Sequence, residues 1–253
     1  MPRALITLDR AVDLARTGDI WLFRGTSGAD RAIRGLTNAP VNHVGMAVVL
    51  DDLPPLMWHA ELGRGLPDMW TGERHRGVQL HDLGAAVLQW GQRYGQRGWV
   101  RQLAGELTRE HEDRLLRVIA RLDGTPFPST AALAGRWLRG RLPPLRHRRD
   151  DAADREAADL ETAYCAEVVA ATFAEMGLLT AGRTPSWYDP GRFWSGDDLA
   201  LADGFALGGE IEVAVPPAAP ASAPPEPALS GRSSEAGASR GTRRRLPRRL
   251  RRR

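Results

Sequence analysis

The sequence has one cysteine, no lysine and no long apolar run among its 253 residues. A single cysteine excludes an internal disulfide. Without lysine, the glycine-containing stretch 25–28 lacks the side chain that a P-loop uses to hold phosphate. No segment approaches the roughly 18 apolar residues of a membrane-spanning helix. The first ten residues mix acid and base, which is not typical of a secretory signal, and we expect a cytoplasmic protein.

Composition divides the chain near residue 214. Residues 215–253 are rich in proline, alanine and serine and end in arginines, a composition that buries too little apolar area to fold. They carry ten arginines against two glutamates, a net charge of +8, so the formal +4 of the whole chain leaves −4 for residues 1–214. We expect one folded domain over 1–214, with a mobile insertion or surface helix at 141–161, and a disordered tail over 215–253.

The arginine-rich tail has two interpretations. It either contacts an anionic membrane or nucleic acid non-specifically, or it is a solvated run without a partner. The folded part is mildly acidic and gives no reason to expect a nucleic-acid-binding face. The sequence leaves the oligomeric state open.

The order of apolar patterns predicts an α+β fold. Residues 41–50 and 56–61 are strand-like and a turn at 51–55 separates them, which predicts an antiparallel hairpin of undetermined register. Glycines bound a further strand at 18–25, and helical spacing over 4–16 predicts an opening helix. Other predicted elements are strands at 77–80, 98–103 and 209–215, and helices at 30–36, 83–90, 130–140 and from Thr108. Strands and helices do not alternate regularly, which argues against a parallel sheet.

The only cysteine, Cys165, stands at the head of an apolar helix that ends at Gly177. A sole thiol in such a helix is either a small core residue or a nucleophile. We expect Cys165 just inside the helix start, where free N–H groups and the helix dipole stabilise a thiolate. This supplies half of an activating environment.

A neighbouring base would complete the activation of the Cys165 thiol. The sequence has six histidines that could serve. Three lie in polar or charged segments that are typical of solvated side chains: His75, His111 and His147. His81 follows a short strand and is undecided. His43 and His59 lie in apolar strands, where each ring needs a hydrogen-bond partner, and either one alone is more typical of a core histidine. The histidines show no paired ligand spacing, so we expect no metal and no cofactor.

Four segments together resemble a known family: 18–23 (Gly-Asp-Ile-Trp-Leu-Phe), 42–48 (Asn-His-Val-Gly-Met-Ala-Val), 164–169 (Tyr-Cys-Ala-Glu-Val-Val) and 176–179 (Met-Gly-Leu-Leu). They resemble the circularly permuted papain-like enzymes of the YiiX/YaeF type, relatives of the NlpC-type cell-wall endopeptidases and of lecithin:retinol acyltransferase. The histidine strand comes first and the cysteine helix last, as in that family. The resemblance covers about residues 17–195 and implies a permuted papain-like fold, with an antiparallel sheet packed against the nucleophile helix.

The resemblance also implies roles for individual residues. Cys165 would be the nucleophile and His43 the general base. His59 occupies the place of the third polar residue on the next strand, and Glu61, which faces the same side, is the alternative. The backbone N–H of Cys165 would contribute to an oxyanion hole with a second, unidentified donor. Three residues are candidates for the cleft or the core: Tyr164, Trp21 and Trp58.

We therefore expect a cysteine hydrolase or acyltransferase that acts on an amide or ester through a thioester acyl-enzyme. Cell-wall-type peptides are the first substrate class by resemblance, and lipid acyl groups are the second. The alternative is a non-catalytic papain-like binding module in which Cys165 is a buried core residue.

Overall fold

The computed structural model describes residues 4–26, 39–61, 65–126, 153–180, 182–195 and 199–218, with side chains of the long helix described from Tyr164 onward. The predicted helices at 30–36 and 130–140 lie outside these residues. So do most of the predicted insertion at 141–161 and the tail beyond residue 218.

The described elements, in chain order, are β1 (Leu5–Thr7), α1 (Leu8–Asp13), β2 (Ile20–Arg24), β3 (His43–Val48), β4 (Leu56–Glu61), β5 (Gly77–Asp82), α3 (Leu83–Leu88), the π-helix η1 (Gln89–Arg93), β6 (Arg97–Arg101), β7 (Leu103–Ala104), α4 (Arg109–Leu122), α6 (Ala153–Met176), the 3₁₀ turns η2 (Pro185–Trp187) and η3 (Pro190–Phe193), β8 (Ala206–Leu207) and β9 (Ile211–Ala214). None of the described helices is both long and apolar enough to cross a membrane.

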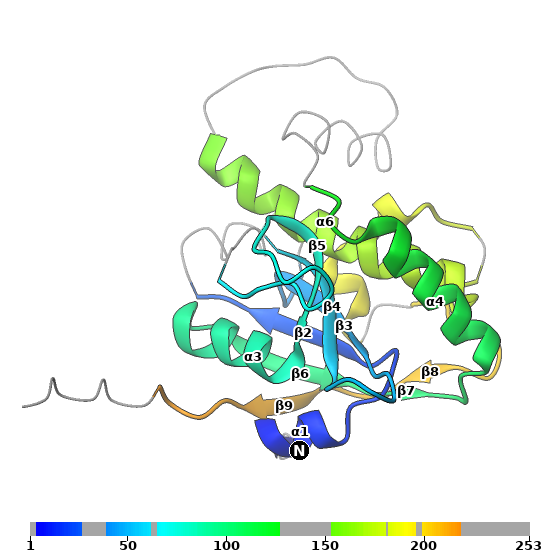
Figure 1. The fold of residues 1–253 in the computed structure, drawn as a ribbon, viewed down its shortest axis with the longest axis horizontal. Coiled ribbons are helices and arrows are strands. Elements are labelled where there is room, and N and C mark those ends of the chain that lie inside the picture. The colour runs from blue at the N-terminus through cyan, green and yellow to red at the C-terminus, as the bar shows by residue number, and fades with distance from the viewer. Residues whose placement is uncertain are drawn as a thin grey trace, which may run out of the picture. The chain divides into compact units, whose positions relative to one another are not determined.

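A seven-stranded sheet organises these elements in the order β1-β9-β6-β2-β3-β4-β5 (Figure 1). All neighbours are antiparallel except β1 and β9, which run parallel. The mixed α+β class is confirmed. The hairpin of β3 and β4 is also confirmed, and its register pairs Met46 with Trp58.

The predicted opening helix over 4–16 is partly wrong. Residues 5–7 form β1, and only Leu8–Asp13 is helical. The physical reason is tertiary pairing, because Leu5 pairs with Glu212 of β9 at the sheet edge. A partner strand of this kind overrides a local helical pattern.

The two faces of the sheet carry separate apolar clusters, because side chains alternate along each strand. One face bears Val44, Met46 and Trp58 and packs against α4 and α6. The opposite face bears Ala47 and Met57 and packs against α1, α3 and η1. Figure 1 shows the sheet between these two groups of helices.

α6 contains the cysteine, but the predicted start of this helix is wrong. It begins at Ala153, twelve residues before Cys165, because the alanine- and glutamate-rich segment ahead of the cysteine consists of good helix formers. The end is as predicted: Gly177 adopts a φ of 81° after Met176. The N–H of Leu178 then bonds to the carbonyl of Phe173 at 2.8 Å and closes the helix.

Candidate functional site

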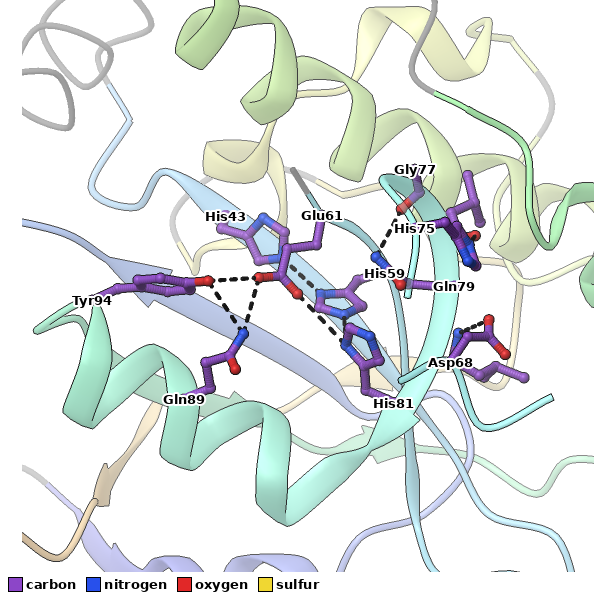
Figure 2. Close-up of polar contacts among 12 residues, drawn as sticks. His43, His59, Glu61, Asp68, His75, Gly77, Gln79, His81, Gln89 and Tyr94 are labelled. Atoms are coloured by element: carbon purple, nitrogen blue, oxygen red, sulfur yellow. Dashed lines mark hydrogen bonds and ion pairs between the residues drawn. The ribbon is translucent and has the colours of Figure 1, made fainter. Parts of the chain in front are cut away.

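A chain of three buried imidazoles crosses β3, β4 and β5 (Figure 2). Nε2 of His43 lies 3.1 Å from Nδ1 of His59, and Nε2 of His59 lies 3.0 Å from Nδ1 of His81. Each side chain is about 1% exposed. The sheet register explains the convergence, since His81 pairs with Met57 and His59 pairs with Gln79, so all four face the same side.

Glu61 lies at the same cluster, two residues beyond His59 on β4. Its Oε2 atom is 3.6 Å from Nδ1 of His81. Its Oε1 atom accepts hydrogen bonds from the hydroxyl of Tyr94 at 3.2 Å and from Nε2 of Gln89 at 3.3 Å. The carboxylate is therefore held from the outer side and directed toward the imidazoles, as Figure 2 shows.

The π-helix η1 supplies the outer wall of this site. Trp90 stacks on the ring of His43, with ring centroids 3.9 Å apart and planes inclined by 26°. Gln89 and Tyr94, at the ends of the same turn, hold Glu61. Widened π turns of this kind occur frequently at functional sites.

Burial sets the charge of the cluster. Desolvation lowers the pKa of His43 to about 3 and that of His81 to about 4, and it lowers the pKa of His59 well below its usual value. Desolvation also raises the pKa of Glu61, while its bonds from Tyr94 and Gln89 oppose that rise. All three rings are therefore neutral at pH 7 and carry lone pairs.

Four polar atoms of the cluster region stay unsatisfied within the described residues. They are Nδ1 of His43, Oε2 of Glu61, Oε1 of Gln79 and Nε2 of His81, all buried without a hydrogen-bond partner. Buried polar groups almost always have a partner. These four atoms are the positions in the cluster that can take a further hydrogen-bond partner or ligand.

Gly45 allows β3 and β4 to bring the histidines together. A Cβ atom at this position would clash with the sulfur of Met57 and would lie 3.3 Å from Cβ of His59. The glycine between His43 and the rest of β3 therefore keeps space on the histidine face.

Cys165 lies in the middle of α6 and is fully buried. It belongs to the apolar cluster with Val44 and Met46, whereas His43 contacts Phe23 and Trp90 of the opposite face. None of the contacts of the imidazole chain described above involves Cys165. The structure brings His43 and His59 together.

The start of α6 at Ala153 also bears on the prediction that the backbone N–H of Cys165 is an oxyanion donor. Inside an α-helix, each N–H bonds to the carbonyl four residues earlier. The N–H of Cys165 therefore does not belong to the free first turn of α6, which was the basis for predicting it as an oxyanion donor.

The three candidates for the cleft or the core are all buried, at 6% exposure or less. Trp58 donates its indole N–H to the hydroxyl of Thr172 on α6 at 3.0 Å. Tyr164 packs in the same apolar cluster as Trp58. Trp21 lies on the other face of the sheet, so the three do not line one surface.

Sequence reasoning missed the roles of His81, Gln89, Trp90 and Tyr94. The strand alternation of residues 77–82 could have found His81, since it places Gln79 and His81 on one face. Nothing in the local pattern of residues 83–94 marks a π turn, so the wall that it forms was not predictable.

Comparisons with family models and with curated proteins give no match. Among solved structures, the chain is similar to the crystal structure of metalloprotein yiiX from Escherichia coli O157:H7, described as DUF1105. The identity is 18% and the TM-score is 0.43, over 76% of this chain and 96% of that one.

Proposed function

We propose that this chain is a cysteine-dependent hydrolase or acyltransferase of permuted papain-like fold. Cys165 is its nucleophile, His43 its general base, and His59 the group that positions His43. The observation that carries the proposal is the 3.1 Å contact of His43 with His59, which leaves the second nitrogen of His43 buried without a hydrogen-bond partner among the described residues. A base held by a third group on one nitrogen and open on the other is the arrangement of a catalytic triad.

In the proposed reaction, the sulfur of Cys165 attacks the carbonyl carbon of an amide or ester while its proton passes to Nδ1 of His43. The same proton then goes to the departing amine or alcohol, which leaves a thioester. Water or a second acceptor attacks the thioester, giving up a proton to His43, and the thiol is restored. Because burial lowers the pKa of His43 to about 3, the resting pair is neutral rather than an ion pair.

The proposal sets a requirement on the positions of Cys165 and His43. Cys165 packs in the apolar cluster of the α6 face, whereas His43 lies on the other face. α6 packs directly against β3 and β4, so the two residues belong to adjoining layers. The proposed reaction requires the sulfur of Cys165 to come within hydrogen-bonding distance of Nδ1 of His43.

For the substrate, we propose a cell-wall-type peptide amide first and a lipid acyl group second. A non-catalytic papain-like binding module is the second candidate function, and the complete burial of Cys165 favours it. In that case the thiol is a small core group and His43 with His59 is a structural pair.

Alkylation of the only thiol separates these functions. Cys165 in the native protein would be treated with iodoacetamide at pH 7.5, with the urea-unfolded chain as the reference for a free thiol. The enzyme predicts native labelling within about tenfold of the unfolded rate, slowed about tenfold or more by His43→Ala. His75→Ala, which changes a histidine outside the cluster, is the matched control.

Native labelling that is a thousandfold slower than in the unfolded chain, and equal in wild type and His43→Ala, would contradict the enzyme and support the binding module. Circular dichroism of each variant checks that the fold is kept.

A further inference from the structure

We propose that His59, Glu61 and His81 form a binding site for one divalent transition-metal ion of the zinc class. The ligand atoms are Nε2 of His59, Nδ1 of His81 and Oε2 of Glu61. Two imidazoles and one carboxylate, with remaining coordination positions open to water or substrate, are a ligand set that zinc enzymes use.

The distances fit such an ion. The three ligand groups offer atoms that all lie within 4.8 Å of one another, with 3.0 Å between the two imidazole nitrogens and 3.6 Å from His81 to Glu61. Metal bonds of about 2.0 to 2.1 Å in a tetrahedron place the ligand atoms about 3.3 to 3.4 Å apart. The two separations that involve His81 differ from that spacing by about 0.2 to 0.4 Å, and the third, between His59 and Glu61, is no more than 4.8 Å.

The outer contacts of the ligands are already in place. His59 offers its second nitrogen to His43 at 3.1 Å, and Glu61 receives Tyr94 and Gln89 on its second oxygen. Metal-binding histidines and carboxylates nearly always have such second partners, which fix their orientation. His59 and Glu61, two of the three proposed ligands, therefore already have a second hydrogen-bond partner.

The unsatisfied carboxylate oxygen is the independent sign of a ligand. Glu61 is 1% exposed, and its Oε2 atom points at the two imidazoles without a hydrogen bond from any described residue. A buried carboxylate needs a proton or a cation. Arg93 acts on Glu61 at longer range, where its charge lowers the pKa of the carboxyl, but no arginine in the described residues lies within ion-pair distance of Glu61, so a metal ion would supply the direct positive partner.

The residues that hold Glu61 are the part of the site closest to solvent. Tyr94 is 37% exposed and Gln89 is half-buried, and both lie directly on the carboxylate. An ion that displaces these two polar side chains reaches the ligands without passing through the apolar core. The expectation of no metal rested on spacing along the chain, whereas strand pairing brings the ligands together.

Cobalt binding to the metal-free full chain is the test, because Co²⁺ reports its own ligands by visible absorption. After dialysis against a chelator, titration should give one saturable equivalent with tetrahedral bands that Zn²⁺ displaces. Glu61→Gln and His81→Asn should each weaken binding at least tenfold. His75→Ala and Cys165→Ser should bind as wild type, so the outcome does not depend on the proposed cysteine chemistry.

Tyr94→Phe provides a variant that leaves every ligand intact. It removes one outer hydrogen bond at a partly exposed residue and should lower the affinity about tenfold, in the range seen for lost outer contacts. Absence of saturable binding, or equal binding by Glu61→Gln, His81→Asn and wild type, would overturn the site. Weakening by His75→Ala as strong as that by His81→Asn would also overturn it.

Discussion

Nε2 of His43 lies 3.1 Å from Nδ1 of His59, and a single hydrogen atom occupies that contact. If the hydrogen belongs to His43, Nδ1 of His43 carries a lone pair and can accept a proton. If it belongs to His59, Nδ1 of His43 carries the hydrogen instead. The tautomer of one buried pair therefore decides whether His43 can be a base.

A bound metal ion should fix this tautomer and suppress thiol chemistry. A metal on Nε2 of His59 places the hydrogen on Nδ1 of His59, so His43 loses its free lone pair. We expect Zn²⁺, at a concentration that just saturates wild type, to slow iodoacetamide labelling of Cys165 at least tenfold in wild type and to slow it less in Glu61→Gln, which binds the ion more weakly. Alkylation rates with and without Zn²⁺ are the measurement, and equal rates in wild type would refute the link.

Trp90 should control the solvation of His43. Its ring stacks on the imidazole at 3.9 Å, and desolvation is the cause of the low pKa of His43. Trp90→Leu should therefore raise the pKa of His43 from about 3 toward the ordinary 6.5, and lower the free energy of unfolding by about 1 to 3 kcal/mol. NMR titration of the imidazole signals checks the first effect.

Trp70→Leu is the matched control, because Trp70 is 58% exposed and is not the ring that stacks on His43. Trp70→Leu should change neither the pKa of His43 nor the free energy of unfolding measurably. An unchanged titration of His43 in Trp90→Leu would show that the stacked ring does not keep water from the imidazole.

Gly45→Ala should strain the histidine face of β3. The added methyl group meets the sulfur of Met57 and Cβ of His59, and overpacking of this kind lowers the free energy of unfolding by about 1 to 3 kcal/mol. Gly209→Ala, whose added Cβ meets nothing within 4 Å, should change it by less than about 0.5 kcal/mol. Urea unfolding compares the two variants, and equal stabilities would contradict the close approach.

Asp123 should make stability depend on pH in a defined window. Desolvation, then a hydrogen bond and repulsion from Asp68, raise the pKa of Asp123 to about 7. Asp68 accepts N–H bonds from Trp70 and Thr71 at 2.6 and 2.9 Å. The folded state thus holds a proton that the unfolded chain releases near pH 3.8, so this group's contribution to stability falls as pH rises from about 4 to about 7.

Asp123→Asn removes that proton and isolates the effect. The stability of Asp123→Asn relative to wild type should be greater at pH 8 than at pH 5. The buried histidines contribute a slope of the opposite sign, but they are common to both proteins and cancel in the difference. Urea unfolding at the two pH values is the measurement, and a pH-independent difference would contradict the raised pKa.

The strands near the site were predictable because their signals are local. Turn residues and apolar runs predicted the β3–β4 hairpin, and two histidines within apolar strands marked themselves as candidates. His43 contacts His59 rather than Glu61. This contact agrees with the preference for His59 that was made from the sequence. The role of His59 stays a prediction.

The remaining parts of the site depend on long-range pairing. His81 joins the chain only because β5 pairs with β4, and Gln89, Trp90 and Tyr94 reach it through a π turn. The surroundings of Cys165 depend on where α6 begins, which strong helix formers ahead of it moved to Ala153. Local patterns contain neither kind of information.

The position of β9 has a consequence for the order of folding during synthesis. This strand pairs with β6 on one side and with β1 on the other. β1 therefore leaves the ribosome before the other described strands but has no partner until β9, the last of them, has been synthesised. Until Ile211–Ala214 emerges, β6 presents an open edge that invites pairing with other chains. Nascent chains halted before residue 211 should therefore be the species that aggregates and that chaperones bind.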